Sequence, residues 1–102
     1  MTEMTSEVKK NIRTMVYEYF SGECDIDIKD ITDATNIIED LEGDSLMLLS
    51  LLEQVRKKYG LSVELKTLGK HLMKKPAETI GQVIALTIGI VEHGDNIINI
   101  EL

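Results

Sequence analysis

The spacing of the apolar residues is the feature that most constrains the fold. In four stretches of the chain, aliphatic side chains recur every three or four positions, as they do on the buried face of a helix. Ile26, Ile28 and Ile31 alternate weakly, like a strand, but a lone strand would have no partner. We therefore expect these three side chains to anchor a loop on a helical core, and we predict an all-α fold.

Sequence signals for helix caps and breaks place the first two helices. The first begins after Thr5-Ser6, which are good capping residues, and stops at Ser21-Gly22. The second runs from about Ser45 to Tyr59 and is ended by Gly60. The side chains expected on the buried faces of these helices are Val8, Ile12, Met15, Val16, Tyr19, Phe20, Leu48, Leu51, Leu52, Val55 and Tyr59.

The last two helices are predicted in the C-terminal half of the chain. A short third helix is interrupted at Gly69 and closes before Pro76. Thr79 and Gln82 have the spacing of a capping box, and the apolar run after them predicts a fourth helix that ends near Gly94. The residues expected on the apolar face of the third helix are Leu65, Leu68, Leu72 and Met73.

A long acidic loop separates the first two predicted helices. Residues 23–44 lack a sustained helical period and hold nine acids against Lys29, a net charge of −8, whereas residues 45–78 carry +4. We expect a loop with a short turn of helix, and loops of this length inside compact domains usually have a function. The whole chain carries −7, and because phosphate binding needs a surplus of Lys and Arg, no nucleic-acid partner is expected.

The size and composition of the chain exclude several further classes. The 102 residues predict a single domain over 1–102, with a core of about 6–92 and a C-terminal tail over 93–102, too small for a large enzyme. Cys24 is the only cysteine, so the fold cannot depend on an internal disulfide. The N-terminus has no secretory signal, and even the apolar run from Leu46 to Leu49 is far too short to cross a membrane. We expect a cytoplasmic protein without membrane insertion.

The stretch Gly43-Asp44-Ser45-Leu46 is the part of the sequence that points to chemistry. It places a serine where an acidic loop enters a helix. The unpaired N–H groups of a first helical turn can receive an anion that is joined to the serine oxygen, so the site suits a phosphoester. The alternative is that Asp44 or Ser45 only caps the helix.

The same four letters also name a family of hydrolases with a nucleophilic serine. The base in that family is the histidine of an Asp-x-x-His pair. Here Leu68 stands three residues before His71, and Ile90 stands three residues before His93, so the pair is absent. We predict no catalytic residue.

No dedicated metal site is predicted. An EF-hand loop that started at Asp25 would need glycine where Asp30 stands and glutamate where Asn36 stands. The cysteine and the two histidines show no ligand spacing.

The stretch from Asn36 to Leu46 resembles the acyl carrier protein family. That family has an apolar residue followed by Asp-Leu, and then Asp-Ser-Leu at the start of its second helix, which Asp40-Leu41 and Asp44-Ser45-Leu46 match. A first helix, a long acidic loop, a short third helix and a last helix introduced by Thr79-Ile80 extend the resemblance over residues 6–92. It implies a four-helix bundle of acyl-carrier-protein type, in a stand-alone bacterial member of the family.

The resemblance also implies a prosthetic group. A phosphopantetheinyl transferase would move 4′-phosphopantetheine from coenzyme A to Ser45, and Asp44 would help to position the metal-bound coenzyme A. The arm ends in a thiol, on which acyl intermediates of fatty-acid, lipid or polyketide-type biosynthesis would travel as thioesters between acyl-loading and acyl-processing enzymes. The protein would then be a monomeric carrier and not an enzyme.

The predicted second helix departs from the family on its exposed face, where other members usually carry acids that meet basic patches on their enzymes. Here the exposed positions are apolar at the start of the helix, include Ser50 and Glu53, and end in Arg56-Lys57-Lys58. Charge complementarity selects partners, so we expect a docking surface for the enzymes of one dedicated pathway. Its expected residues are Leu46, Met47, Glu53, Arg56 and Lys57. The alternative is that the bases only complement the helix dipole in solvent.

Basic residues also mark the predicted third helix and its end. They are Lys66, Lys70, His71, Lys74 and Lys75. These side chains fit contact with a partner or with the acidic loop, and the sequence leaves both open.

Two other functions remain open from the sequence. An aminoacyl or peptidyl carrier would share Ser45 and the arm, and would differ only in the enzyme that loads it. A helical protein-interaction module would have no prosthetic group.

Overall fold

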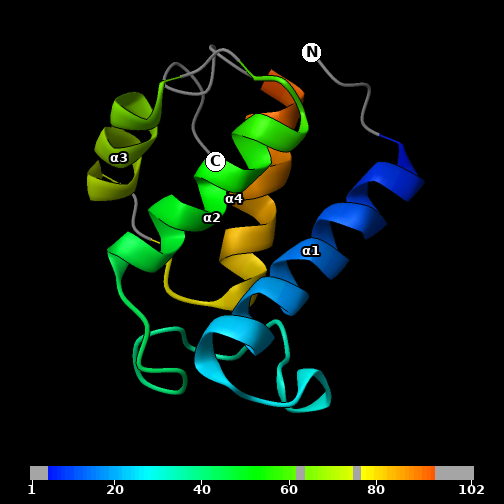
Figure 1. Ribbon diagram of the computed structural model, residues 1–102, viewed down its shortest axis with the longest axis vertical. Coiled ribbons are helices and arrows are strands. Elements are labelled where there is room, and N and C mark those ends of the chain that lie inside the picture. Colours follow the sequence, from blue (N-terminus) through cyan, green and yellow to red (C-terminus); the bar gives the residue numbers. More distant parts are fainter. Residues whose placement is uncertain (1–4, 62–63, 75–76, 94–102) are drawn as a thin grey trace.

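The computed structural model describes residues 5–61, 64–74 and 77–93. Over these ranges the chain forms four α-helices and one turn of 3-10 helix (Figure 1). In chain order they are α1 (Ser6–Cys24), η1 (Ile28–Asp30), α2 (Ser45–Lys58), α3 (Leu65–Lys74) and α4 (Ile80–His93). The all-α fold, the long loop with its short helical turn and the short third helix are therefore confirmed.

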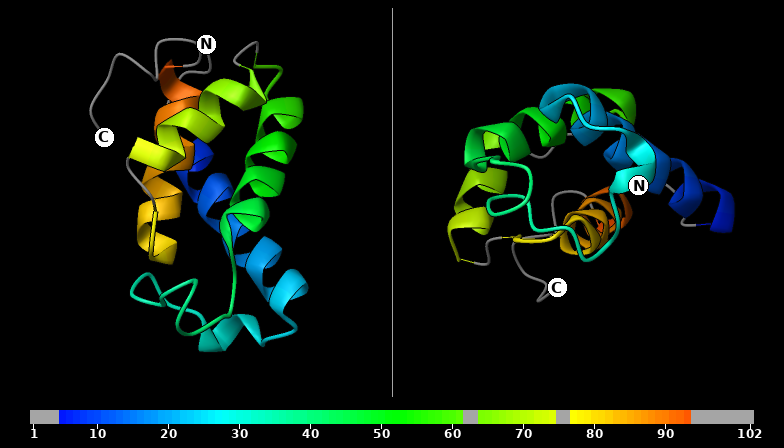
Figure 2. Two further views of the ribbon diagram at one scale, coloured as in Figure 1. Left: turned by 90° about the vertical axis from the view of Figure 1, so that its left-hand side faces the viewer. Right: turned by 90° about the horizontal axis from the view of Figure 1, so that it is seen from below.

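The helices alternate in direction and form a bundle. α1 packs chiefly on α4, while α2 packs on α3 and α4 (Figure 2). The loop between α1 and α2 lies at the end of the bundle where α1 stops and α2 begins (Figure 1). Within the described ranges, no helix combines the length and the apolarity that a membrane span would need.

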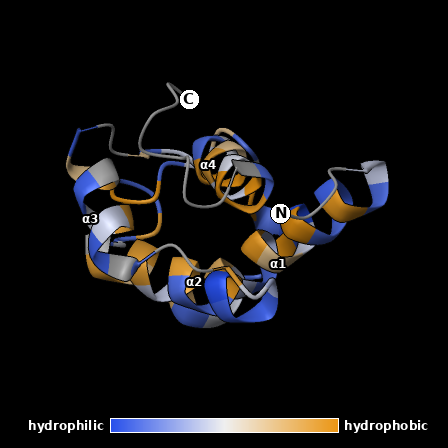
Figure 3. Ribbon diagram, turned by 90° about the horizontal axis from the view of Figure 1, so that it is seen from above, coloured by the Kyte–Doolittle hydropathy of each residue, from blue (hydrophilic) through white to orange (hydrophobic). Residues whose placement is uncertain are grey.

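The core is aliphatic, and the loop contributes to it. Apolar parts of the helices face the interior of the bundle (Figure 3). Ile31 and Ile37 of the loop are 4% and 1% exposed, and Ile26 packs against the core. The largest fully buried residues are Ile12, Val16, Phe20, Ile37, Leu51, Leu52, Val55, Leu68, Ile80, Val83 and Ile90.

Among the side chains that the structure describes, two apolar ones that were predicted to face the core do not, while the Leu65 side chain lies outside the described part. Ile28 is 42% exposed because it lies in η1, whose turn directs it outward while Ile31 enters the core. Met73 is 85% exposed. It follows the buried Leu72, and successive helical residues point about 100° apart, so it leaves the face that Leu68 and Leu72 share.

Two predicted helix breaks are also wrong. α1 continues through Ser21-Gly22 to Cys24 and ends at Asp25, which adopts a left-handed conformation with φ 51°. Ser21 forms part of the C-cap, since its carbonyl accepts the Ile26 N–H at 3.1 Å and its hydroxyl donates to the Ile26 carbonyl at 2.6 Å. α3 runs through Gly69 without interruption, because packing on α2 offsets the low helix propensity of one glycine.

Other boundaries agree with the sequence. Gly60 follows α2 with φ 62°, as a C-terminal glycine should. At the start of α4, the Thr79 hydroxyl accepts the Gln82 N–H at 3.2 Å, and the Gln82 side chain accepts the Thr79 N–H at 3.1 Å. The capping box is therefore confirmed. Of the tail predicted over 93–102, His93 is instead the last residue of α4, and residues 94–102 lie outside the described residues.

The loop is fixed to the rest of the bundle at the start of α4. The Ile37 N–H donates to the Glu78 carbonyl at 2.8 Å, and the Gly81 N–H donates to the Asp33 carbonyl at 2.9 Å. The Asp33 carboxylate also receives hydrogen bonds from Arg13 and Tyr17 of α1. These contacts give the segment that leads into α2 a defined position.

Candidate functional site

The N-terminus of α2 is capped by Asp44. Its backbone is extended, with φ −143° and ψ 179°, and its Oδ1 accepts the Met47 N–H at 3.0 Å. Ser45 is the first residue of the helix, although its side chain lies outside the part that the structure describes. Because Asp44 supplies the cap, the helix does not need Ser45 for that role.

Gly43 holds the chain close to the core immediately before this cap. Its N–H donates to the Ile37 carbonyl at 2.8 Å. A Cβ at this position would lie 2.6 Å from Ile37 Cγ2 and 3.2 Å from Met47 Sδ, so a side chain would clash. The neighbouring Glu42 takes a left-handed conformation with φ 55°. The segment before Ser45 is therefore a tight turn that packs closely against the buried Ile37.

The first turn of α2 rests on the end of α1. The Tyr19 hydroxyl donates to the Met47 carbonyl at 2.8 Å, and the Cys24 thiol lies 3.9 Å from Met47 Sδ. Burial raises the pKa of the Tyr19 hydroxyl and that of the Cys24 thiol, so both groups stay protonated at neutral pH. Met47, expected to be exposed, is instead half-buried in this contact.

The outer face of α2 starts with an exposed apolar residue. Leu46, next to Ser45, is 72% exposed. Glu53 is half-buried and paired, because Arg56 holds its two carboxylate oxygens at 2.9 and 3.0 Å and Lys57 Nζ lies 3.8 Å away. The hydrogen bonds from Arg56 lower the pKa of Glu53. The charge of the one acid in α2 is thus compensated within the helix, and the face is positive toward its C-terminal end.

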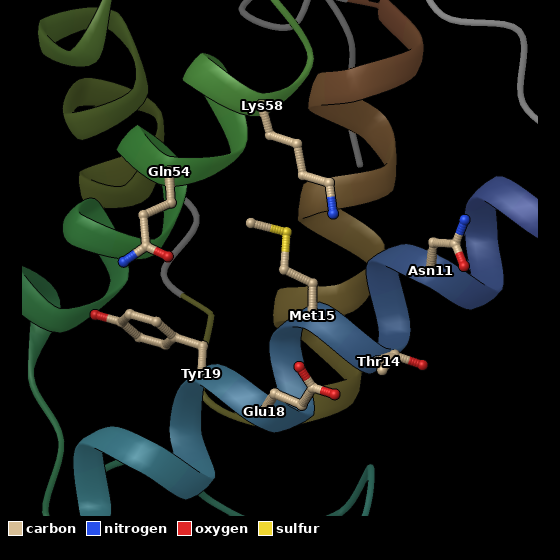
Figure 4. A pocket seen from close by; sticks show the side chains of 7 residues that line it. All are labelled: Asn11, Thr14, Met15, Glu18, Tyr19, Gln54 and Lys58. Carbon is tan, nitrogen blue, oxygen red and sulfur yellow. The ribbon is translucent and has the colours of Figure 1, made fainter.

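A pocket of about 440 Å³ lies between α1 and α2 (Figure 4). Five of its seven lining residues are polar or charged, so it does not offer the aliphatic surroundings that an acyl chain needs. Tyr19 connects this pocket to the first turn of α2. The lining residues are Asn11, Thr14, Met15, Glu18, Tyr19, Gln54 and Lys58.

Two contributors to the site are not predicted by the sequence. Tyr19 was expected only as a core residue, yet its hydroxyl fixes the Met47 carbonyl. The Ile37 side chain packs against Gly43, and no pattern in the linear sequence indicates that these two residues are in contact. The glycine before Asp44 was the single local signal of a close approach.

The surroundings of position 45 fit a phosphodiester-linked group. The N–H groups of a first helical turn and the positive end of the helix dipole favour an anion there. Gly43 adds no side chain beside this helix end, and the exposure of Leu46 shows that the end opens to solvent. The Asp44 carboxylate caps this helix end by accepting the Met47 N–H.

Comparison with known proteins agrees with this geometry. Residues 16–86 match a family model described as "Phosphopantetheine attachment site". The chain thus belongs to the acyl carrier protein family, whose members are carriers and not enzymes. It is 46% identical over 100 residues to a protein of Clostridium acetobutylicum named "Acyl carrier protein homolog", and the alignment covers 98% of this chain and 97% of that protein. No solved structure matches the chain.

Membership of this family brings a covalent 4′-phosphopantetheine group. When bound, it supplies a flexible arm with a terminal thiol that carries cargo as a thioester. The family also implies interaction with a phosphopantetheinyl transferase and with enzymes that handle the cargo.

Proposed function

We propose that the protein carries acyl intermediates on 4′-phosphopantetheine attached to the hydroxyl of Ser45. The observation that carries this proposal is the position of Ser45 as the first residue of α2, directly after a cap that Asp44 already provides. A serine there is not needed for capping, and it stands where helix N–H groups favour a phosphate.

The protein's own residues fix the geometry of attachment. Asp44 holds the first turn of α2 through the Met47 N–H. Its charge would also help to position the metal-bound coenzyme A on the transferase, as the resemblance to the family implies. Ile37 and Gly43 hold the loop in its tight turn, so the serine is presented at the outer end of the bundle.

The docking surface proposed for partner enzymes is the outer face of α2. Leu46, 72% exposed beside the attachment point, is the apolar contact, and Met47 supports it from its half-buried position. Arg56 and Lys57 both pair with Glu53, and two bases against one acid leave the far end with a net positive charge. Family members usually present acids here, so these residues favour one dedicated pathway of fatty-acid, lipid or polyketide-type biosynthesis.

The chain is further proposed to act as one cytoplasmic carrier domain over residues 1–102, with its core over 6–92, and as a monomer. The described helices share a single core, which supports one domain. A lone half-buried cysteine gives the fold no need for an oxidising compartment.

Attachment of the arm is tested by intact mass. The purified protein is incubated with coenzyme A, Mg²⁺ and a phosphopantetheinyl transferase, and then weighed. We expect a gain of one phosphopantetheine. If the mass of this protein stays unchanged while a known carrier gains the arm in the same tube, the result would contradict the proposal and favour a helical interaction module.

Dedication to one pathway is tested with the loaded protein. We expect the general fatty-acid synthase enzymes of the host to turn it over more slowly than they turn over the host's main carrier. Equal turnover would contradict a dedicated partner set. Loading by an enzyme that activates amino acids, and not by acyl-transferring enzymes, would identify an aminoacyl or peptidyl carrier.

A further inference from the structure

α3 presents a row of lysines to solvent. Lys66, Lys70 and Lys74 stand four residues apart, so they follow one another along one side of the helix, and all three are exposed. The opposite side holds Leu68 and Leu72, which are 1% and 7% exposed. The helix contains no acid. We refer to Lys66, Lys70 and Lys74 as the basic ridge.

The acidic loop does not neutralise the basic ridge. Within the described ranges, the ion pairs lie within α2, within the loop, and between the loop and α1, and none includes a lysine of the ridge. The loop instead packs on α1 through η1 and on the start of α4. Of the two contacts that the sequence left open, contact with the loop is not seen for these three lysines in the described ranges, and contact with a partner is the one pursued below. The His71 side chain and Lys75 lie outside the described residues.

An exposed apolar side chain accompanies the ridge. Met73 is 85% exposed and lies between Lys70 and Lys74 in the sequence, on the side of α3 that faces away from the core. Methionine is flexible and adapts readily to an apolar pocket on another protein. The other apolar side chains described in α3, Leu68 and Leu72, are buried, so the described side chains of the helix offer no continuous apolar face to a lipid surface.

We propose that the basic ridge and Met73 together dock on a partner protein whose surface carries carboxylates around an apolar pocket. The proposal rests on the carrier function proposed above, since the enzymes that load and process a cargo must each bind the carrier. The charge of the chain supports it: residues 45–78 carry +4 in a protein of net charge −7, so an acidic partner is attracted to this side and repelled by the loop.

The test compares two charge reversals of equal size, in the apo protein for the phosphopantetheinyl transferase and in the phosphopantetheine-loaded protein for the acyl-loading enzyme. The ridge variant is Lys66→Glu with Lys70→Glu, and the control is Lys9→Glu with Lys10→Glu on the exposed side of α1. Circular dichroism first confirms that both variants fold. The KM for each carrier is then measured at about 0.01 M and about 0.5 M salt. The enzymes are the phosphopantetheinyl transferase, with the apo forms, and the acyl-loading enzyme of the same organism.

For at least one of these enzymes, we expect the ridge variant to raise KM about tenfold at low salt, and the control to change it less than about twofold. The wild-type KM should rise with salt, and Lys66→Arg with Lys70→Arg should keep the wild-type value. Met73→Ser should raise KM without changing its salt dependence.

A ridge variant that matches the control with both enzymes, although it accepts the arm normally, would overturn the docking proposal and leave the carrier function intact. Vesicles of anionic phospholipid provide a second arm of the test. Salt-sensitive binding of the wild type to these vesicles, lost in the ridge variant while both KM values stay unchanged, would show a lipid-binding surface and contradict a protein partner.

Discussion

The hydroxyl of Tyr19 donates a 2.8 Å hydrogen bond to the backbone carbonyl of Met47, which joins the end of α1 to the first turn of α2. The N–H of the same residue, Met47, is held by Asp44 at 3.0 Å. One residue of α2 thus connects the helix cap with the neighbouring helix. The position of Ser45, two residues earlier, is set by α1 and by the loop as well as by α2.

Removal of the Tyr19 hydroxyl should loosen this connection. We expect Tyr19→Phe to lower the free energy of unfolding by about 1 kcal/mol, because the ring stays packed and one hydrogen bond is lost. Tyr59→Phe is the matched control, since no hydrogen bond of the Tyr59 hydroxyl is found in the described chain, and it should change stability by less than about 0.5 kcal/mol. Urea denaturation measures both. Equal effects of the two substitutions would contradict a structural role for the Tyr19 hydroxyl.

Substitutions at Asp44 should separate its cap from its charge. Asp44→Ala removes the acceptor of the Met47 N–H and should destabilise the protein by about 1 kcal/mol, whereas Asp44→Asn keeps an acceptor and most of the stability. If the carboxylate also positions coenzyme A, both variants should receive the arm more slowly than the wild type. Thermal melts and the rate of phosphopantetheine transfer are the measurements. If Asp44→Asn received phosphopantetheine at the wild-type rate, the role of Asp44 would be restricted to capping the helix.

Two glycine-to-alanine substitutions should have opposite signs. At Gly43 the new Cβ would meet Ile37 Cγ2 at 2.6 Å, so Gly43→Ala should cost about 1–3 kcal/mol of stability. Gly22 lies inside α1 with no neighbouring atom within 4 Å of the place that a methyl group would take, so Gly22→Ala should stabilise the protein by about 0.5–1 kcal/mol. Chemical denaturation of the two variants compares these values directly. A neutral Gly43→Ala would show that the turn before Ser45 has room for a side chain.

Asp33 should make the stability of the protein depend on pH. Hydrogen bonds from Tyr17 and Arg13 lower the pKa of Asp33 in the folded state. The ionised form is therefore favoured by folding, and this contribution is present above the ordinary aspartate pKa of about 4 and is lost as the pH falls through the lowered value. Since the side chain is half exposed, the contribution should not exceed about 1 kcal/mol.

The measurement is the stability difference between the wild type and Asp33→Asn from pH 7 down to about pH 2.5. We expect the variant to be less stable at pH 7, and the difference to shrink below about pH 4. Asp30 is an exposed residue of the same loop, and Asp30→Asn controls for the loss of one negative charge from a segment rich in acids. A difference that stays constant over the whole range would show that the ionisation of Asp33 does not stabilise the fold.

The sequence predicted those parts of the fold that depend on local signals. The capping box at Thr79 and Gln82 and the glycine after α2 are such signals, and both operate as expected. The sequence predicts helix breaks at Gly22 and Gly69, but each glycine lies within a helix that tertiary packing stabilises. A single glycine lowers helix propensity without deciding the outcome.

The contacts that shape the candidate site join residues that are distant in the chain. Tyr19 with Met47 is one such pair, and Asp33 with Arg13 is another. Composition and periodicity carry no information on such pairs, because these depend on how α1 meets both the loop and α2. The motif from Gly43 to Leu46 could be located from the sequence, whereas its support by Ile37 could not.

The assignment of the arm to Ser45 is tested most directly by intact mass measurement of two serine variants after incubation with coenzyme A and a phosphopantetheinyl transferase. Ser45→Ala should gain no mass. Ser50→Ala, exposed in the same helix and changed by the same single atom, should gain one phosphopantetheine as the wild type does. A mass gain in Ser45→Ala, or its loss in Ser50→Ala alone, would contradict attachment at Ser45.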